Sequence, residues 1–199
     1  MNLLGNPSNL KIVLVRAGST ALDEQGRITG ALDMPLSTVG EEEARETSVE
    51  LIDYEFSAIF SASCLAAQQT AHQLSRDGQI RIRVEESWTN LDHGLWHGKS
   101  LDELKETQPR LYRLWNENPE SICPPGGETI EEVRNRVVHS LKKIRRKYKN
   151  CVVAIVAPEP LFSIIRAAIE DSEVRDLLQH RSDFGSWEAI TFPNDIPVY

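Results

Sequence analysis

Lys11-Ile12-Val13-Leu14-Val15-Arg16-Ala17-Gly18-Ser19-Thr20 is the stretch that decides the fold of this chain. Residues 12–15 form a continuous apolar run, which is typical of a strand buried on both faces of a sheet. Arg16 and a series of small residues follow the strand directly. Open α/β sheets bind ligands in the loops at the carboxyl ends of their strands. The stretch therefore predicts both a buried strand and the edge of the sheet at which a site would lie.

Strand-like and helix-like segments alternate along the rest of the chain, which indicates an α/β protein. Further strands are expected over residues 58–61, 80–84, 151–156 and 187–192. Helices are expected over residues 39–51, 65–74, 101–115 with an interruption at Pro109, 129 onward, 161–168 and 174–178. Thr38 and Glu41 have the spacing of a capping box for the first of these helices. Neither a repeat nor a linker divides the chain. We therefore predict one domain over residues 1–199, a three-layer α/β/α fold with a mostly parallel central sheet.

The composition and net charge of the chain argue against some classes of binding partner. The chain has 199 residues, a formal net charge of -8 and 40% hydrophobic residues, as in a soluble globular protein. An acidic chain is not expected to bind nucleic acid or an anionic membrane surface. Cys64, Cys123 and Cys151 do not form a disulfide framework, and the amino terminus does not read as a signal peptide. We therefore expect a cytoplasmic protein that neither contacts nor crosses a membrane.

Several further motifs follow the first strand in a fixed order. They are Gly26-Arg27-x-x-Gly30-x-x-Asp33-x-Pro35-Leu36-x-x-x-Gly40, Ser61 with Ala67-Gln68-Gln69-Thr70-Ala71, Gly94-x-Trp96-x-Gly98, Pro125-Gly126-Gly127-Glu128 and Val153-Ala154-Ile155-Val156. Together with Arg16-x-Gly18 they resemble the histidine phosphatase (phosphoglycerate mutase-like) superfamily over most of the chain. A match to one of them alone would mean little, but the ordered set predicts the phosphoglycerate mutase-like fold.

The resemblance implies a phosphate site built from two histidines, two arginines and an acidic glutamate. The first arginine is present as Arg16. The other four positions carry groups that cannot do this chemistry: Ala17 for the nucleophilic histidine, Ala66 for the second arginine, Asn90 for the glutamate and Pro158 for the second histidine. A methyl group cannot attack phosphorus. We therefore expect that no catalytic residue of the family is intact.

The residues left to bind a ligand are expected around the same place. They are Arg16, Gly18, Asp23, Arg27, Glu159 and His93. Asp23 falls where the family has an asparagine, and Glu159 follows the last core strand. Two carboxylates in the pocket would repel a phosphate dianion, so even passive phosphate binding is expected to be weak. The aromatic residues within 111–115 are expected to pack over this pocket.

Other chemistry has less support in the sequence. His93, His97 and Asp92 could suggest a metal site, but the glycine between the histidines argues against a helical pair of ligands. Cys64 lies in a strand-to-helix turn, where a thiol pKa can be lowered, although a small buried filler is the simpler interpretation. The basic cluster at residues 142–149 reads as a solvated helix end, with a docking patch for an acidic partner as the alternative. We predict no metal and no cofactor.

Three functions remain open. The first is a pseudophosphatase that acts by binding a small ligand, a protein partner or a catalytically competent relative. A homodimer of this chain is also expected as a possible assembly. The second is a phosphatase or phosphomutase with a relocated mechanism, for which Arg16, Arg27 and the loop histidines are available. The third is a new enzyme that uses Glu159, Asp23 or His93 on a substrate without phosphate.

Overall fold

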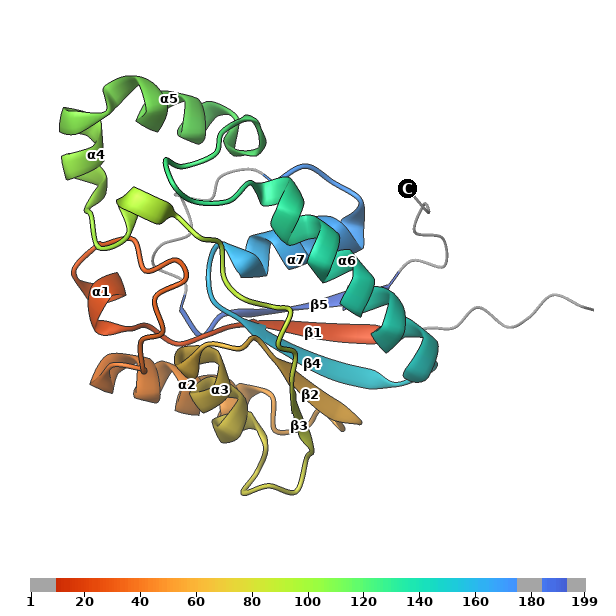
Figure 1. Ribbon diagram of the computed structural model, residues 1–199. Helices are drawn as coiled ribbons and strands as arrows, with labels where there is room; N and C mark the ends of the chain where they lie inside the picture. Colours follow the sequence, from red (N-terminus) through yellow and green to blue (C-terminus); the bar gives the residue numbers. More distant parts are fainter. Residues whose placement is uncertain (1–9, 175–183, 193–199) are drawn as a thin grey trace, which may run out of the picture.

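The computed structural model describes residues 10–174 and 184–192, and these form a five-stranded sheet in the order β3-β2-β4-β1-β5 (Figure 1). The strands are β1 (Lys11–Arg16), β2 (Ala58–Ser61), β3 (Ile82–Val84), β4 (Val152–Ala157) and β5 (Trp187–Thr191). β5 pairs antiparallel with β1, and the other pairings are parallel. The predicted α/β fold with a mostly parallel sheet is confirmed.

Helices cover both faces of this sheet (Figure 1). The helices are α1 (Ala21–Glu24), α2 (Thr38–Glu50), α3 (Leu65–Leu74), α4 (Leu101–Thr107), α5 (Pro109–Glu117), α6 (Ile130–Lys147) and α7 (Leu161–Glu170), with short 3-10 turns η1 (Gly94–Trp96) and η2 (Pro119–Ser121). α2 and α3 lie on one face, and α6 and α7 lie on the other. α4 and α5 form a hairpin beyond one end of the sheet.

The sheet is buried because its central strands are apolar on both faces. Residues 12–15 of β1 and 153–156 of β4 are 0% exposed. The apolar stripe predicted for the helix after Thr129 packs onto this sheet, and its residues Ile130, Val133, Val137, Leu141 and Ile144 are all buried. Continuous apolar runs and a regular helical stripe are the strongest secondary-structure signals in a sequence.

The structure corrects several predicted boundaries. Ser37, not Thr38, caps α2, because the Ser37 side chain accepts the N–H of Gly40. β3 is shorter than the predicted 80–84. The predicted interruption at Pro109 is confirmed, because α4 ends at Thr107 and α5 begins at Pro109, and α5 continues to Glu117, past the predicted end at 115. α1 has only four residues, and we did not predict it. Of the helix predicted over residues 174–178, Val174 lies outside any helix and the rest falls outside the described residues.

Two further predictions concern the whole chain. None of the helices in the described part of the chain is long and apolar enough to span a membrane. The single domain over residues 1–199 stays a prediction.

The loop after β1 and the start of α2 approach each other at two glycines. A Cβ on Gly40 would collide with the backbone oxygen of Ser19, and a Cβ on Gly18 would collide with the carbonyl oxygen of Gly40. Glycine is the residue that permits such an approach between backbones. This contact therefore holds the loop after β1 in place.

Replacing Gly40 with alanine is expected to destabilise the protein, although alanine usually stabilises a helix relative to glycine. Alanine for glycine inside a helix normally stabilises by about 0.5–1 kcal/mol. We expect Gly40→Ala to lower the free energy of unfolding by about 1–3 kcal/mol, because the added methyl group overpacks against Ser19. Urea unfolding measures the change, with the exposed α2 substitution Glu46→Ala as the control. A stabilised Gly40→Ala variant would show that the approach is not tight.

Candidate functional site

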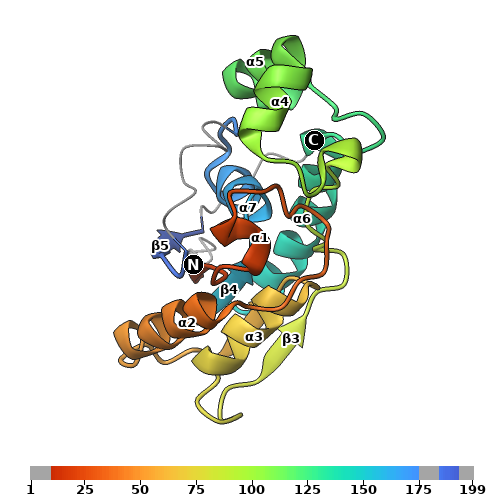
Figure 2. The same cartoon turned by 90° about the vertical axis from the view of Figure 1, so that its left-hand side faces the viewer.

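The candidate site lies at the carboxyl-terminal edge of the sheet, where β1 and β4 end side by side. Arg16 is the parallel partner of Ala157, and the N–H of Ala17 donates to the Ala157 carbonyl at 2.9 Å. Ala17 and Pro158 therefore leave the sheet at neighbouring points. Figure 2 looks onto this edge, with α1 near the centre and α4 and α5 above it.

A small cavity, the inner chamber, lies directly beyond these strand ends. Its volume is about 30 Å³, which is room for about two water molecules. Its lining residues are Ala17, Gly18, Thr20, Asp23, Thr29, Gly30, Leu32, Met34, Cys64, Ala66, Asn90, Pro158, Glu159 and Phe184. Ala17, Ala66, Asn90 and Pro158, the positions at which the resemblance implies catalytic groups, thus surround one cavity.

The side chains that line the inner chamber determine what chemistry it can support. Its described lining contains no imidazole, no lysine and no arginine. Its ionisable side chains are the carboxyls of Asp23 and Glu159 and the thiol of Cys64. A site that holds a phosphoryl group needs cations or N–H donors aimed at its oxygens. The inner chamber therefore lacks both a nucleophilic histidine and a cationic clamp.

A second cavity of about 70 Å³, the outer chamber, adjoins the first, and the two share the lining residues Asp23, Thr29, Gly30, Glu159 and Phe184. Polar side chains on its wall are Arg16, Asp23, Arg27, Thr29, His93 and Glu159, and the apolar ones include Ile28, Trp96, Leu101, Leu104, Tyr112, Trp115 and Phe184. Five of the six predicted binding residues therefore meet here, and the sixth, Gly18, lines the inner chamber. Tyr112 and Trp115 confirm that the aromatic segment 111–115 packs over the pocket.

Asn90 joins three segments of the chain around the inner chamber. Its Nδ2 donates to the carbonyls of Gly30 at 3.0 Å and Glu159 at 2.8 Å. Its Oδ1 accepts the N–H of Leu91 at 2.9 Å and of Leu161 at 3.2 Å. An amide side chain has two donor hydrogens and an oxygen with two lone pairs, so Asn90 is fully used. It is a structural bridge, with no proton to give to a leaving group.

Arg16 and Glu159 form the charged base of the outer chamber. The Arg16 side chain is buried, with 3% of the residue exposed, and its Cζ lies 4.3 Å from the centre of the Phe184 ring. Glu159 Oε1 accepts the hydroxyl of Ser163 at 2.9 Å. Burial raises the pKa of Glu159, and the nearby Arg16 cation partly opposes that rise. The Arg16 cation and the Glu159 carboxyl therefore influence each other electrostatically.

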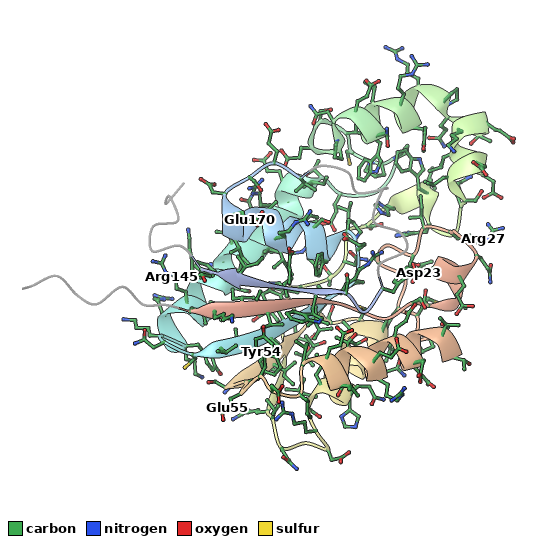
Figure 3. All side chains as sticks on the ribbon, turned by 180° about the vertical axis from the view of Figure 1, so that it is seen from behind. Asp23, Arg27, Tyr54, Glu55, Arg145 and Glu170 are labelled. Carbon is green, nitrogen blue, oxygen red and sulfur yellow. The ribbon has the colours of Figure 1, made fainter. Side chains whose placement is uncertain are left out.

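Asp23 and Arg27 lie at the same end of the sheet, far from Arg145 at the opposite end (Figure 3). Asp23 Oδ2 accepts the N–H and the hydroxyl of Thr20 at 2.9 and 2.7 Å, and Asp23 Oδ1 accepts the hydroxyl of Thr29 at 3.1 Å. Arg27 Nη1 donates to the Gly98 carbonyl at 2.6 Å. Both residues line the pocket while they hold together the loops around it.

The two loop histidines have different roles. His97 Nε2 accepts the N–H of Ala31 and of His93, both at 3.2 Å, so this nitrogen carries no proton and its lone pair is used. His93 is buried, and its ring meets that of Trp115 edge-on with centroids 5.5 Å apart. His93 therefore packs against the aromatic wall, and His97 accepts backbone hydrogen bonds. In residues 10–174 and 184–192, no three His, Cys, Asp or Glu side chains gather as a metal site would require.

Cys64 is the residue before α3, at its amino-terminal cap position. Burial raises the pKa of its thiol to about 11. A helix amino terminus can lower a thiol pKa, but desolvation wins here. Cys64 is half-buried rather than fully buried, and its raised thiol pKa favours the filler interpretation over the reactive-thiol alternative.

Sequence reasoning missed two residues of the site. Phe184, which lines both chambers, belongs to none of the family motifs; the glycine after it signals a turn and nothing more. Thr70 lies within a motif, yet its contact could not be foreseen: its hydroxyl oxygen accepts the N–H of Gly18 at 3.1 Å. Both contacts depend on tertiary packing.

Truncating Asn90 should destabilise the fold. Asn90→Ala leaves the carbonyls of Gly30 and Glu159 and the N–H of Leu161 without their buried partner. Because each unsatisfied buried group costs about 1–3 kcal/mol, we expect a loss of about 2–4 kcal/mol in the free energy of unfolding. Urea unfolding tests this, with the exposed Asn116→Ala as control. Equal stability of the two variants would refute the bridging role.

Cys64 should be slow to alkylate. A thiol with a pKa near 11 is about 0.1% thiolate at pH 8, against roughly a quarter for an ordinary thiol of pKa 8.5. We expect iodoacetamide to modify Cys64 at least 10-fold more slowly than the exposed Cys123. Peptide mass spectrometry over time measures both sites in one sample. Faster labelling of Cys64 would revive the reactive-thiol alternative.

The chain is 30% identical over 148 residues to phosphoserine phosphatase 1 of Hydrogenobacter thermophilus, covering 74% of this chain and 70% of that protein. Three longer mycobacterial proteins are also 30% identical, and the match spans 45% of their length.

Solved structures share the fold. YhfR of Bacillus stearothermophilus superposes with a TM-score of 0.80 at 24% identity, over 90% of each chain. A phosphoserine phosphatase of Entamoeba histolytica, solved as a histidine-to-alanine mutant in complex with phosphoserine, superposes with a TM-score of 0.76 at 20% identity, over 90% of this chain and 89% of that one.

The family profile of the histidine phosphatase superfamily (branch 1) matches residues 12–198. With that match, the chain is a member of the histidine phosphatase superfamily.

Proposed function

We propose that this protein is a pseudophosphatase, which binds a small ligand in the outer chamber and transfers no phosphoryl group through histidine. One observation carries the proposal. The inner chamber, where the resemblance puts the phosphate, has Ala17 and Pro158 at the two histidine positions and no cation in its described lining. It is lined by the carboxyls of Asp23 and Glu159 instead, which supply no positive charge to a phosphate.

The rate and the binding energy that a phosphatase loses without its nucleophile and its clamping arginine are large, which supports the proposal. Losing the nucleophile of a catalytic unit costs on the order of 10⁶ in rate. Losing a clamping arginine removes charge-assisted hydrogen bonds worth about 1.5–3 kcal/mol each. Neither loss has an evident substitute in the inner chamber, because Asn90 and Asp23 are engaged in the chain's own hydrogen bonds.

A phosphatase with a relocated mechanism is the second candidate, and the relatives favour it over binding alone. The curated relatives include proteins named as phosphatases, among them one for phosphoserine and one for adenosylcobalamin and α-ribazole. Arg16, Arg27 and His93 line the outer chamber and are the material for such a mechanism. The Entamoeba mutant supports a narrower point for this chain, that the fold can bind a phosphate ester after a histidine is replaced by alanine.

The remaining expectations stay predictions. They are a protein partner, a homodimer, a cytoplasmic location and the lack of nucleic-acid and membrane contacts. The third hypothesis, a new enzyme acting on a substrate without phosphate, would have to use Glu159, Asp23 or His93, all of which line the outer chamber.

A phosphatase assay separates the two candidates. With p-nitrophenyl phosphate, phosphoserine and 3-phosphoglycerate, we expect the native chain to show no turnover above that of Arg16→Ala, because neither a nucleophile nor a clamp lies at the phosphate position. The triple variant Ala17→His, Ala66→Arg, Pro158→His tests whether the scaffold can regain activity.

Native turnover well above background that is lost in Arg16→Ala and in His93→Ala would establish the relocated mechanism and overturn the pseudophosphatase proposal. Circular dichroism of each variant checks that the loss does not come from unfolding.

A further inference from the structure

Phe184 has a position in the site that no family motif accounts for. It lines both chambers, and its ring centre lies 4.3 Å from the Cζ atom of Arg16. Arg16 lines the outer chamber and is not part of the inner chamber's wall. The one retained arginine of the phosphate site is therefore stacked under an aromatic ring, away from the cavity beside Ala17 and Pro158.

The chain holds this ring in place through the two residues that follow it. Gly185 has a φ of +72°, and a Cβ there would lie 2.8 Å from Thr47 Oγ1 and 3.0 Å from the Glu43 carbonyl. Thr47 Oγ1 donates to the Gly185 carbonyl at 2.6 Å. The N–H of Arg16 donates to the Ser186 carbonyl at 2.9 Å. α2 and β1 thus fix the segment that presents Phe184.

The ring also changes what the outer chamber can hold. Phe184 and Tyr112 contribute to its wall together with Trp96 and Trp115, whose rings meet edge-on at 5.6 Å. The volume of about 70 Å³ is about half that of a 150 Å³ cavity that holds a benzene molecule. One aromatic ring would therefore be partly buried here, with its remainder in the open mouth, and aromatic walls favour stacked and edge-on contacts with it.

We infer that Phe184 sets the selectivity of this pocket: its ring covers one face of the Arg16 guanidinium and, with the other aromatic walls, makes the outer chamber favour a small single-ring ligand without a phosphate group over one that carries phosphate. This inference rests on the proposed function, since it names the class of ligand that the outer chamber would bind. A phosphate has four oxygens to place, while the inner chamber has room for about two waters and contributes carboxyls instead of cations.

Phenol and phenyl phosphate test the inference as a matched pair of probes. The chain has four tryptophans, and their indole N–H signals report binding in ¹⁵N-labelled full-length protein. Trp96 and Trp115 line the outer chamber, while Trp88 and Trp187 do not and serve as internal controls. We expect phenol to shift the Trp96 and Trp115 signals saturably, and phenyl phosphate to bind at least about 10-fold more weakly.

Two variants of Phe184 identify its part in this selectivity. Phe184→Ala should bring the ratio of the two dissociation constants close to one, and Phe184→Leu, which keeps apolar bulk, should retain most of the native preference. Val49→Ala, an exposed truncation on α2, should leave the ratio unchanged. Unshifted Trp88 and Trp187 signals confirm that each variant is folded.

Three results would overturn the inference. They are tighter binding of phenyl phosphate than of phenol by the native chain, a ratio that Phe184→Ala leaves unaltered, and saturable binding of neither probe. Release of inorganic phosphate from phenyl phosphate, followed by ³¹P spectra of the same samples, would instead contradict the proposed function. The two failures therefore have separate readouts.

Discussion

The parallel pairing of β1 with β4 is the constraint on which the rest of this structure depends. It places Arg16 opposite Ala157, so that the two chain segments leaving the sheet, at Ala17 and Pro158, start side by side. Every group of the candidate site is then arranged around that point by loops that return to it. The central residues of both strands are buried on both faces, and the two strands pair residue for residue from Lys11 with Val152 to Arg16 with Ala157, which sets where the two chain segments leave the sheet.

The residues at the positions where the resemblance implies catalytic groups support the surrounding structure. Asn90 ties the loop at Gly30 to the segment after β4, and Phe184 covers the arginine that remains. Active sites usually keep strained or mutually repulsive groups at a cost in stability. Here the inner chamber is small and its polar side chains bond within the chain, which leaves room for about two water molecules where the resemblance implies a phosphate.

The sequence predicted what depends on local pattern and missed what depends on tertiary contact. The buried strands β1 and β4 and the stripe of α6 follow from apolar periodicity, and the motif order located all four replaced positions around one chamber. α1 was missed because four residues carry no periodicity. The cap of α2 was placed one residue late because Ser37 and Thr38 are both good caps. Phe184 reaches Arg16 only because β5 pairs with β1, which no motif indicates.

A crystal structure of the native chain grown with orthovanadate, a mimic of the phosphoryl group in transfer, tests the central claim most directly. The account predicts no vanadate in the inner chamber, with the Phe184 ring still against Arg16. Vanadate bonded to a side chain such as His93, or held by Arg16 with Phe184 displaced, would show a working phosphoryl site and contradict the account.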